Sequence, residues 1–278
     1  MSETGPTPQG GGEARPRRID CVLVAGGKYH DIDFARLELL KLLAEDDRVR
    51  VRVFEDYENV AAITAADFLI SYTCDIVPSL TAQEAIRGWV ERGGQWYALH
   101  GTNSILRWTA DGRVEAPRWA PLHMDTLGSQ FISHPPITPY PVEVTQPGHP
   151  LVAGVEPFET TDEIYLMDIH ADLDVLLHTR FGGSTPEFVD AEWPEADHPV
   201  FYIRTLGAGQ ILYLTLGHCR GHYDLQPVME WWPTVDRCAW DLPVFHTLLR
   251  RGIEWVKNAA ASSTASRTKE RQTGAGER

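Results

Sequence analysis

The sequence has little cysteine, and the cysteines it has form no recognisable motif. Cys21, Cys74, Cys219 and Cys238 are the four among 278 residues, and their spacing matches no Cys-x-x-Cys zinc or redox pattern. Cys21 and Cys74 adjoin apolar runs, as small buried side chains do. Because disulfide frameworks belong to oxidising compartments, we expect a cytoplasmic protein.

Long apolar runs and excess positive charge are also missing. No apolar run approaches the ~20 residues that a membrane-spanning helix needs, and residues 1–18 lack the apolar segment of a secretory signal. Lys and Arg total 25 against 39 Asp and Glu, which gives a net charge of −14. Such a chain repels phosphate backbones and anionic lipid, so we expect neither nucleic acid nor a membrane as a partner.

Several motifs of known enzyme classes are absent. The sequence contains no Gly-x-Ser-x-Gly elbow, no His-Glu-x-x-His zinc motif, no Gly-x-Gly-x-x-Gly fingerprint and no Walker lysine motif. The pair Gly26-Gly27 by itself indicates a plain tight turn rather than a phosphate-binding loop.

The composition predicts one domain between two tails. Residues 1–18 are polar and rich in Gly and Pro, and residues 259–278 hold Ser, Thr, Gly and charge with little to bury, so we expect both to be disordered. Hydrophobic residues make up 43% of the chain, enough for a sizeable core. The domain is therefore expected over residues 19–258.

Strand and helix signals alternate in the first half of this domain. Short apolar runs predict strands, and a 3.6-residue periodicity predicts helices, the second of which begins with the capping-box spacing of Thr81 and Glu84. The expected strands are 19–24, 50–54, 68–71 and 95–99, and the expected helices are 33–44 and 81–93. This alternation predicts a parallel sheet with helices on both faces.

The second half is less regular. Residues 107–141 carry many Pro, Trp and His residues and little periodicity. Further strands are expected at 141–145, 175–179, 200–204 and 210–215, and a closing amphipathic helix at 242–257. A long aperiodic stretch inside a compact domain is typical of functional loops, and these loops carry most of the histidines.

Several histidines fall where strands are expected to end. His30 follows the first strand, His100 ends the strand 95–99, and His218 follows the strand 210–215; His134 and Glu163 lie in the intervening loops. A lone loop histidine is usually solvated. Ligands of open α/β sheets bind beyond the carboxyl ends of the strands, so these side chains are expected to converge there.

The order of these residues resembles a known family. The segments that carry the resemblance are Leu99-His100, Phe131-Ile132-Ser133-His134-Pro135, His149-Pro150-Leu151, Asp162-Glu163-Ile164-Tyr165, Gly207-Ala208-Gly209-Gln210, Leu216-Gly217-His218 and Trp255. In this order and spacing, over about residues 19–257, they are similar to the ThuA-like proteins of trehalose utilisation.

The resemblance implies a flavodoxin-like, mostly parallel sheet like that of class I glutamine amidotransferases. Those enzymes place a nucleophilic cysteine after a central strand and a histidine with a nearby carboxylate after a late strand. Here His100 takes the place of the cysteine, and Arg220 stands two residues beyond His218 where an acid would be expected. Thioester chemistry is therefore not expected, and Cys219 lies outside the elbow.

The resemblance further implies carbohydrate utilisation, of trehalose, a related disaccharide or a 3-keto-sugar, together with a sugar oxidoreductase. On this hypothesis His100, Glu163 and His218 are catalytic, with His100 and Glu163 as acid and base. His30 and His134 bind substrate, and aromatic faces such as Tyr165 stack on the sugar. The same imidazoles and carboxylate can instead bind zinc or another divalent ion.

Other functions remain open. The reaction could be that of a hydrolase, a lyase or an isomerase, and a hydrolase could use Cys219. The main alternative is a non-catalytic module that binds a sugar or a partner enzyme. A homo-oligomer is a further expectation, because the Trp-rich segment 229–240 could expose an apolar patch; alternatively this segment covers the core.

Overall fold

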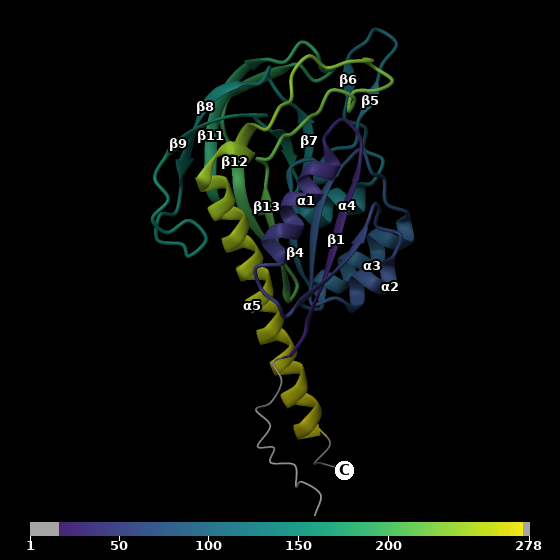
Figure 1. Ribbon diagram of the computed structural model, residues 1–278, viewed down its shortest axis with the longest axis vertical. Coiled ribbons are helices and arrows are strands. Elements are labelled where there is room, and N and C mark those ends of the chain that lie inside the picture. The colour runs from purple at the N-terminus through teal and green to yellow at the C-terminus, as the bar shows by residue number, and fades with distance from the viewer. Residues whose placement is uncertain (1–16, 275–278) are drawn as a thin grey trace, which may run out of the picture.

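The centre of the molecule is a nine-stranded mixed sheet (Figure 1), seen here in a computed structural model that describes residues 17–274. The strand order is β2-β1-β3-β4-β13-β12-β11-β8-β9. The strands are β1 (Ile19–Gly27), β2 (Val49–Phe54), β3 (Phe68–Cys74), β4 (Gln95–Leu99), β8 (Thr138–Val144), β9 (Phe158–Asp162), β11 (Asp174–Ser184), β12 (Glu192–Leu206) and β13 (Gly209–Leu214).

The two halves of this sheet differ in strand direction. The neighbours from β2 to β13 pair in parallel, in the doubly wound order of flavodoxin-like sheets. From β13 to β9 every pairing is antiparallel. The α/β class is confirmed, but the expected mostly parallel sheet is a mixed one. The reason lies in connections such as the short turn after Leu206, which joins β12 to β13 and can only connect antiparallel strands.

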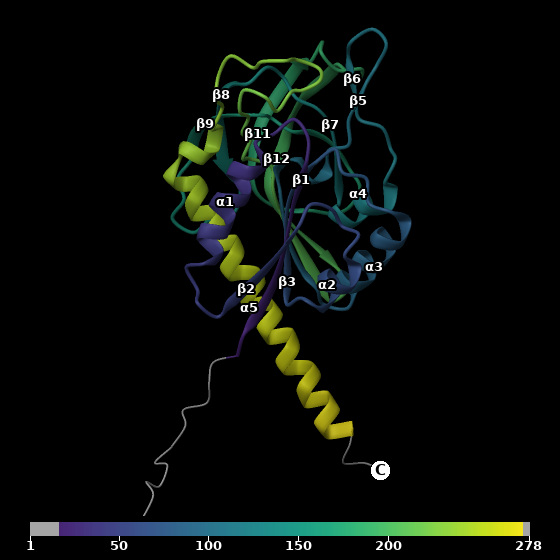
Figure 2. The ribbon, with the colours of Figure 1, turned by 45° about the vertical axis from the view of Figure 1, so that its right-hand side comes forward.

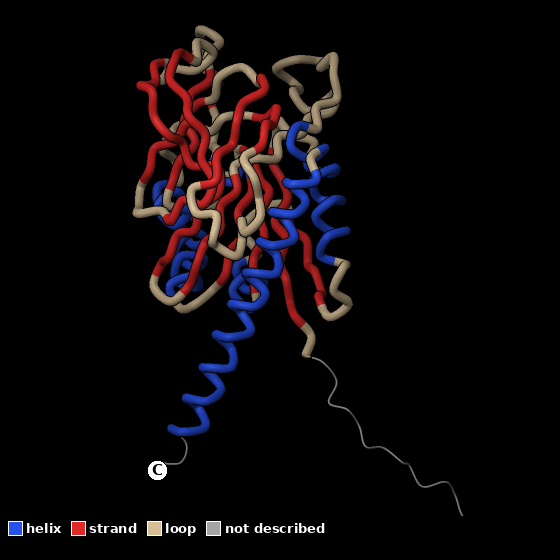
Figure 3. Tube along the Cα trace, turned by 90° about the vertical axis from the view of Figure 1, so that its left-hand side faces the viewer, coloured by secondary structure: helices blue, strands red, loops and turns tan. Residues whose placement is uncertain are grey.

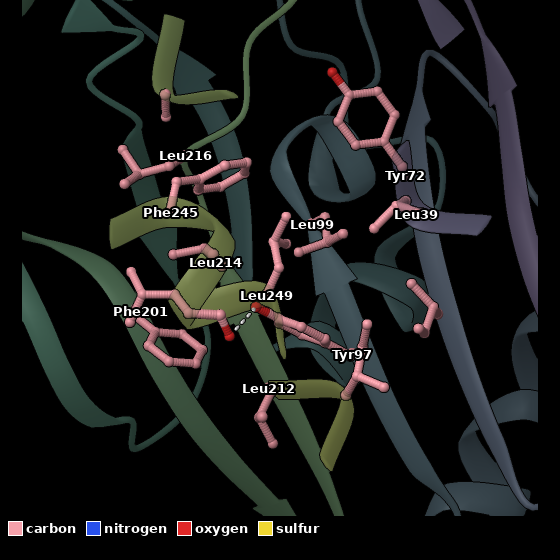
Figure 4. Packing of buried hydrophobic residues seen from close by; sticks show 14 of the residues in the cluster. Leu39, Tyr72, Tyr97, Leu99, Phe201, Leu212, Leu214, Leu216, Phe245 and Leu249 are labelled. Atoms are coloured by element: carbon pink, nitrogen blue, oxygen red, sulfur yellow. Dashed lines mark hydrogen bonds between the residues drawn. The ribbon is translucent and has the colours of Figure 1, made fainter. Parts of the chain in front are cut away.

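Helices cover both faces of the sheet (Figure 2). Helices α1 (Ile32–Leu43) and α5 (Pro243–Gly274) lie on one face, and α2 (Val60–Ala65), α3 (Leu80–Glu91) and α4 (Pro121–Leu127) lie on the other. In the first of the two resulting cores, Tyr97 packs beside Leu212 and Leu249 (Figure 4), and its hydroxyl donates a hydrogen bond to the carbonyl of Leu248 at 3.3 Å.

Several boundaries differ from the sequence expectation: β11 and β12 extend well beyond the expected 175–179 and 200–204, β9 was not expected, and two helices change as well. Helix α3 begins at Leu80, because the Ser79 side chain rather than that of Thr81 caps it and accepts a hydrogen bond from the amide of Ala82. Helix α5 continues to Gly274, through much of the segment expected to be a tail, and extends beyond the sheet (Figure 3). The N-terminal tail prediction falls largely on residues 1–16, outside the described residues.

Shorter elements occupy the region expected to be irregular. They are β5 (Arg107–Trp108), β6 (Val114–Glu115), β7 (Ser129–Ser133), β10 (Leu166–Ile169) and the 3₁₀ turns η1 (His100–Asn103) and η2 (Cys238–Asp241). Strand β7 ends immediately before His134, and β9 ends immediately before Glu163. Within residues 17–274, no helix is long and apolar enough to cross a membrane.

Candidate functional site

The parallel strands all end at one edge of the sheet. In the pairing register Gly27 lies beside Cys74, and Leu99 lies between Tyr72 and Leu214. The first strand can end so close to its neighbour only with glycine at position 27, where φ is +109° and a Cβ would lie 1.8 Å from the carbonyl oxygen of Cys74. The loops after these strands therefore start from a common edge.

Four side chains converge at this edge. Nε2 of His30 lies 2.8 Å from Nε2 of His100, whose Nε2 is 3.5 Å from Oε2 of Glu163. Nδ1 of His218 lies 2.9 Å from Oε1 of the same carboxylate. One ligand atom from each of the four residues lies within 4.8 Å of the others, and all four are buried. His134 adjoins this cluster with its Nε2 3.5 Å from Glu163 Oε1.

His100 occupies a sharp turn between β4 and η1. Its φ is +44°, a left-handed value that a histidine adopts only when the surrounding structure holds it there. Its Nδ1 lies 2.8 Å from the carbonyl oxygen of Thr215, and its own carbonyl accepts a hydrogen bond from Tyr213. The turn thus directs the imidazole of His100 over the carboxyl ends of the strands.

Asp162 fixes the loops that carry Glu163 and His218. Its buried carboxylate accepts hydrogen bonds from the amides of Glu163 at 2.8 Å, Gly217 at 2.9 Å, His218 at 3.1 Å and Ala239 at 3.2 Å. Sequence reasoning gave this residue no role of its own, although it stands next to Glu163. It is a positioning residue, because both of its oxygens are used on backbone amides.

Glu163 is the anionic member of the cluster. Burial alone would raise the pKa of its carboxyl, but His134, His218 and His100 together lower the pKa well below its usual range. In contrast, burial lowers the pKa of His100 to about 4. A carboxylate surrounded by imidazoles at the floor of a pocket can accept a proton or bind a cation.

The cluster lies at the floor of a cavity of about 490 Å³, a size typical of small-molecule sites. His30, His134, Glu163 and Tyr165 line it, whereas His100 and His218 lie behind them with no exposed surface. Its other walls are largely aromatic or apolar and include Tyr29, Trp108, Phe131, Phe188 and Trp232.

Tyr165 packs against the cluster and is 2% exposed. Its ring centroid is 4.9 Å from that of His100 and 4.7 Å from that of Phe131. The structure therefore brings together all six side chains that the sequence singled out as catalytic or substrate-binding, namely His30, His100, His134, Glu163, Tyr165 and His218; their roles remain proposals.

Arg220 is a cavity residue that sequence reasoning considered only as a missing acid. Its Nε donates to the carbonyl of Tyr29 at 3.0 Å, and its guanidinium carbon lies 5.1 Å from the ring centre of Trp232. Both aromatic residues line the cavity with it, so Arg220 adds a fixed positive charge to the wall. The sequence feature that could have identified Arg220 as a cavity residue is its position two residues after His218.

The tryptophans of the segment 229–240 have different environments. Trp240 is buried in the core, Trp232 lines the cavity, and Trp231 is 50% exposed and stacks on His222 at 4.0 Å. The segment therefore contributes to both core and cavity, and self-association through it stays a prediction.

Cys219 does not have the surroundings of a nucleophile. It is fully buried, its Sγ is 3.2 Å from the Tyr72 hydroxyl, and burial raises the pKa of its thiol to about 12. Because the thiolate is the reactive form, a thiol that stays protonated at neutral pH does not support a cysteine hydrolase.

Acid should destabilise the protein through buried neutral histidines. Burial lowers the pKa of His123, which contacts the carbonyl of Thr102 in η1, to about 4. Between pH 6.5 and pH 4 the unfolded chain therefore binds a proton that the folded chain does not, and stability falls on acidification by on the order of 3 kcal/mol for this group. Urea unfolding at several pH values should show that the free energy of unfolding falls less steeply on acidification for His123→Gln than for the wild type. Equal slopes would contradict this assignment.

The protein is thus an α/β protein with a doubly wound half-sheet and a buried imidazole–carboxylate cluster at its strand ends. A model of the ThuA family, described as trehalose utilisation, matches residues 21–232. The chain belongs to this family, and the resemblance drawn from the sequence is confirmed.

Solved structures agree with this assignment. A ThuA-like protein from Bacteroides uniformis ATCC 8492 superposes with a TM-score of 0.60 at 17% identity, over 88% of this chain and 94% of that chain. A ThuA-like protein from Parabacteroides merdae ATCC 43184 gives 0.56 at 17% identity, over 87% and 90%. At this identity they show a shared fold. A comparison with the curated proteins gives no match.

Proposed function

We propose that this protein is an enzyme of carbohydrate metabolism that acts on a disaccharide such as trehalose, or on its 3-keto derivative, in the cavity above Glu163. The observation that carries the proposal is a buried carboxylate in contact with three imidazoles at the floor of an aromatic-walled cavity. Aromatic faces bind the apolar faces of sugar rings, and polar groups at the floor select and activate the hydroxyl or carbonyl groups. The family description, trehalose utilisation, points to the same substrate class.

The donor set favours proton transfer over direct glycoside hydrolysis. Glycosidases generally use two carboxyl groups, one of them as a general acid. Here Glu163 is the one carboxylate of the cluster, and the neighbouring Asp162 is engaged by four backbone amides. In a keto-sugar, Glu163 can take a proton from the carbon beside the carbonyl while an imidazole stabilises the developing oxyanion. This is the first step of an isomerase or a lyase, and it requires a partner oxidoreductase that forms the keto group.

The test is proton exchange on a 3-keto-disaccharide in D₂O, followed by NMR. We expect deuterium to enter at the carbon beside the carbonyl and His134→Ala to raise KM about tenfold, because His134 lines the cavity. His178→Ala serves as the control, since this histidine lies on β11, where it contacts Thr145 and does not line the cavity.

The alternative is a module that binds a sugar without converting it. It predicts a thermal shift with the disaccharide or its keto derivative but neither deuterium uptake nor a product. That combination of results would overturn the catalytic proposal.

A further inference from the structure

We propose that His30, His100, His218 and Glu163 form a binding site for one divalent transition-metal ion, with zinc as the reference ion. The four residues come from different loops, are all buried, and offer ligand atoms that lie within 4.8 Å of one another. Three imidazole nitrogens and one carboxylate oxygen are ligands that zinc and its first-row neighbours prefer, whereas magnesium and calcium prefer oxygen alone.

The hydrogen bonds of two of these rings set their protonation. Nδ1 of His30 lies 3.2 Å from the carbonyl oxygen of Lys28, and Nδ1 of His100 lies 2.8 Å from that of Thr215. A carbonyl oxygen only accepts, so each Nδ1 carries the proton and each neutral ring presents a lone pair at Nε2. These two Nε2 atoms face each other at 2.8 Å.

Two lone pairs at that separation repel, so either one ring carries a second proton and donates Nε2–H to the other, or a metal ion binds both nitrogens side by side. An Nδ1 proton directed at a backbone carbonyl is also the usual way in which proteins orient a metal-binding histidine. The arrangement of His30 and His100 therefore has the second-sphere contacts of a metal site.

His218 supplies an independent observation. Although Nδ1 lies 2.9 Å from Glu163, neither ring nitrogen has a hydrogen-bond partner among the described residues, and the side chain has no exposed surface. A buried polar atom without a partner is costly and calls for an explanation. A bound ion satisfies one of these nitrogens and balances the charge of Glu163.

The spacing of the four residues fits an ion after small shifts. Two ligands bonded at about 2.1 Å to one ion lie about 3.0 Å apart in an octahedral site and about 3.4 Å apart in a tetrahedral one. The measured separations of 2.8, 2.9 and 3.5 Å bracket these values. His30 and Glu163 face the cavity, so an ion beside them would be open to a substrate oxygen.

This inference deepens the proposed function, because an ion at that point would polarise the sugar carbonyl, and in this respect it rests on that proposal. The binding of the ion is testable without any sugar. Protein stripped with a chelator is titrated with Zn²⁺ by calorimetry, and with Co²⁺ by visible absorption, which reports the ligands through the d–d bands. We expect one ion per chain and little response to Mg²⁺.

Ligand variants decide where the ion binds. His218→Ala and, in case that chain folds poorly, His30→Asn should each weaken Zn²⁺ binding at least about 100-fold while circular dichroism stays unchanged. His123→Gln is the matched control, since His123 is also a buried histidine but lies outside the cluster. We expect it to bind Zn²⁺ as the wild type does.

The result that overturns the site is the absence of saturable binding in the wild type, or equal affinity in the wild type and both ligand variants. The two proposals fail separately. Tight binding of Zn²⁺ without sugar conversion leaves the metal site and removes the enzyme, whereas sugar conversion without saturable Zn²⁺ binding leaves the enzyme and removes the metal site.

Discussion

If Glu163 is the base of the proposed reaction, its replacement by glutamine is expected to lower kcat/KM on the proposed keto-sugar substrate by about 10²–10⁴-fold, the range that general acid–base catalysis supplies. Glutamine preserves the volume and one oxygen but has no basic lone pair that can take a proton. Because three imidazoles hold the pKa of Glu163 well below its usual range, the wild-type group is ionised throughout the neutral range, and the variant loses both this charge and the proton acceptor. Each decade corresponds to ~1.4 kcal/mol of transition-state stabilisation.

Steady-state kinetics on purified Glu163→Gln measures this loss, with a thermal melt to verify folding. Glu159→Gln is the matched control, because Glu159 precedes Glu163 by four residues and is exposed on β9. We expect the control to retain wild-type kinetics. A kcat/KM of the Glu163→Gln variant within about threefold of the wild-type value would mean that this carboxylate takes no part in the reaction.

Replacing Asp162 by alanine is expected to destabilise the fold by on the order of 4 kcal/mol. The substitution leaves the buried amides of Glu163, Gly217, His218 and Ala239 without their acceptor, and each unpaired buried donor costs about 1–3 kcal/mol before the loops relax. These amides belong to the loop after β9, the loop after β13 and the turn η2. The loss should therefore displace Glu163 and His218 as well as lower stability.

Urea unfolding of Asp162→Ala and Asp162→Asn tests this role. The asparagine variant should lose less stability than the alanine variant, because its single side-chain oxygen can still accept hydrogen bonds from some of these amides. Thr161→Ala, at the adjacent exposed position on β9, is the control and should change stability by no more than about 0.5 kcal/mol. A loss in Asp162→Ala as small as that in the control would show that the three segments hold their places without the carboxylate.

The sequence predicted the parallel half of the sheet well because that half is encoded locally. Each buried strand is a short apolar run, and each is followed by a turn or an amphipathic helix, so the position of His30, His100 and His218 at strand ends followed from pattern alone. Glu163 and His134 were singled out only as residues of the intervening loops, because no periodicity marks the ends of β7 and β9.

The antiparallel half was harder to predict for physical reasons. β8 and β9 contain Pro, Thr and Glu and alternate between buried and exposed residues, so neither forms the short apolar run that marks a buried parallel strand. The role of Asp162 was missed because its carboxylate accepts hydrogen bonds from the backbone amides of residues 217, 218 and 239. These residues are far away in the chain, and no local sequence pattern reveals the contacts.

The site also joins the two halves of the sheet. Its three deepest imidazoles follow β1, β4 and β13 of the parallel half, whereas Glu163 and His134 follow β9 and β7 outside that half. Residues 129–165 therefore supply the carboxylate and part of the cavity wall, and through Asp162 they also hold the loop that carries His218. A change in how the antiparallel half packs on the parallel half should therefore move Glu163 and His218 together.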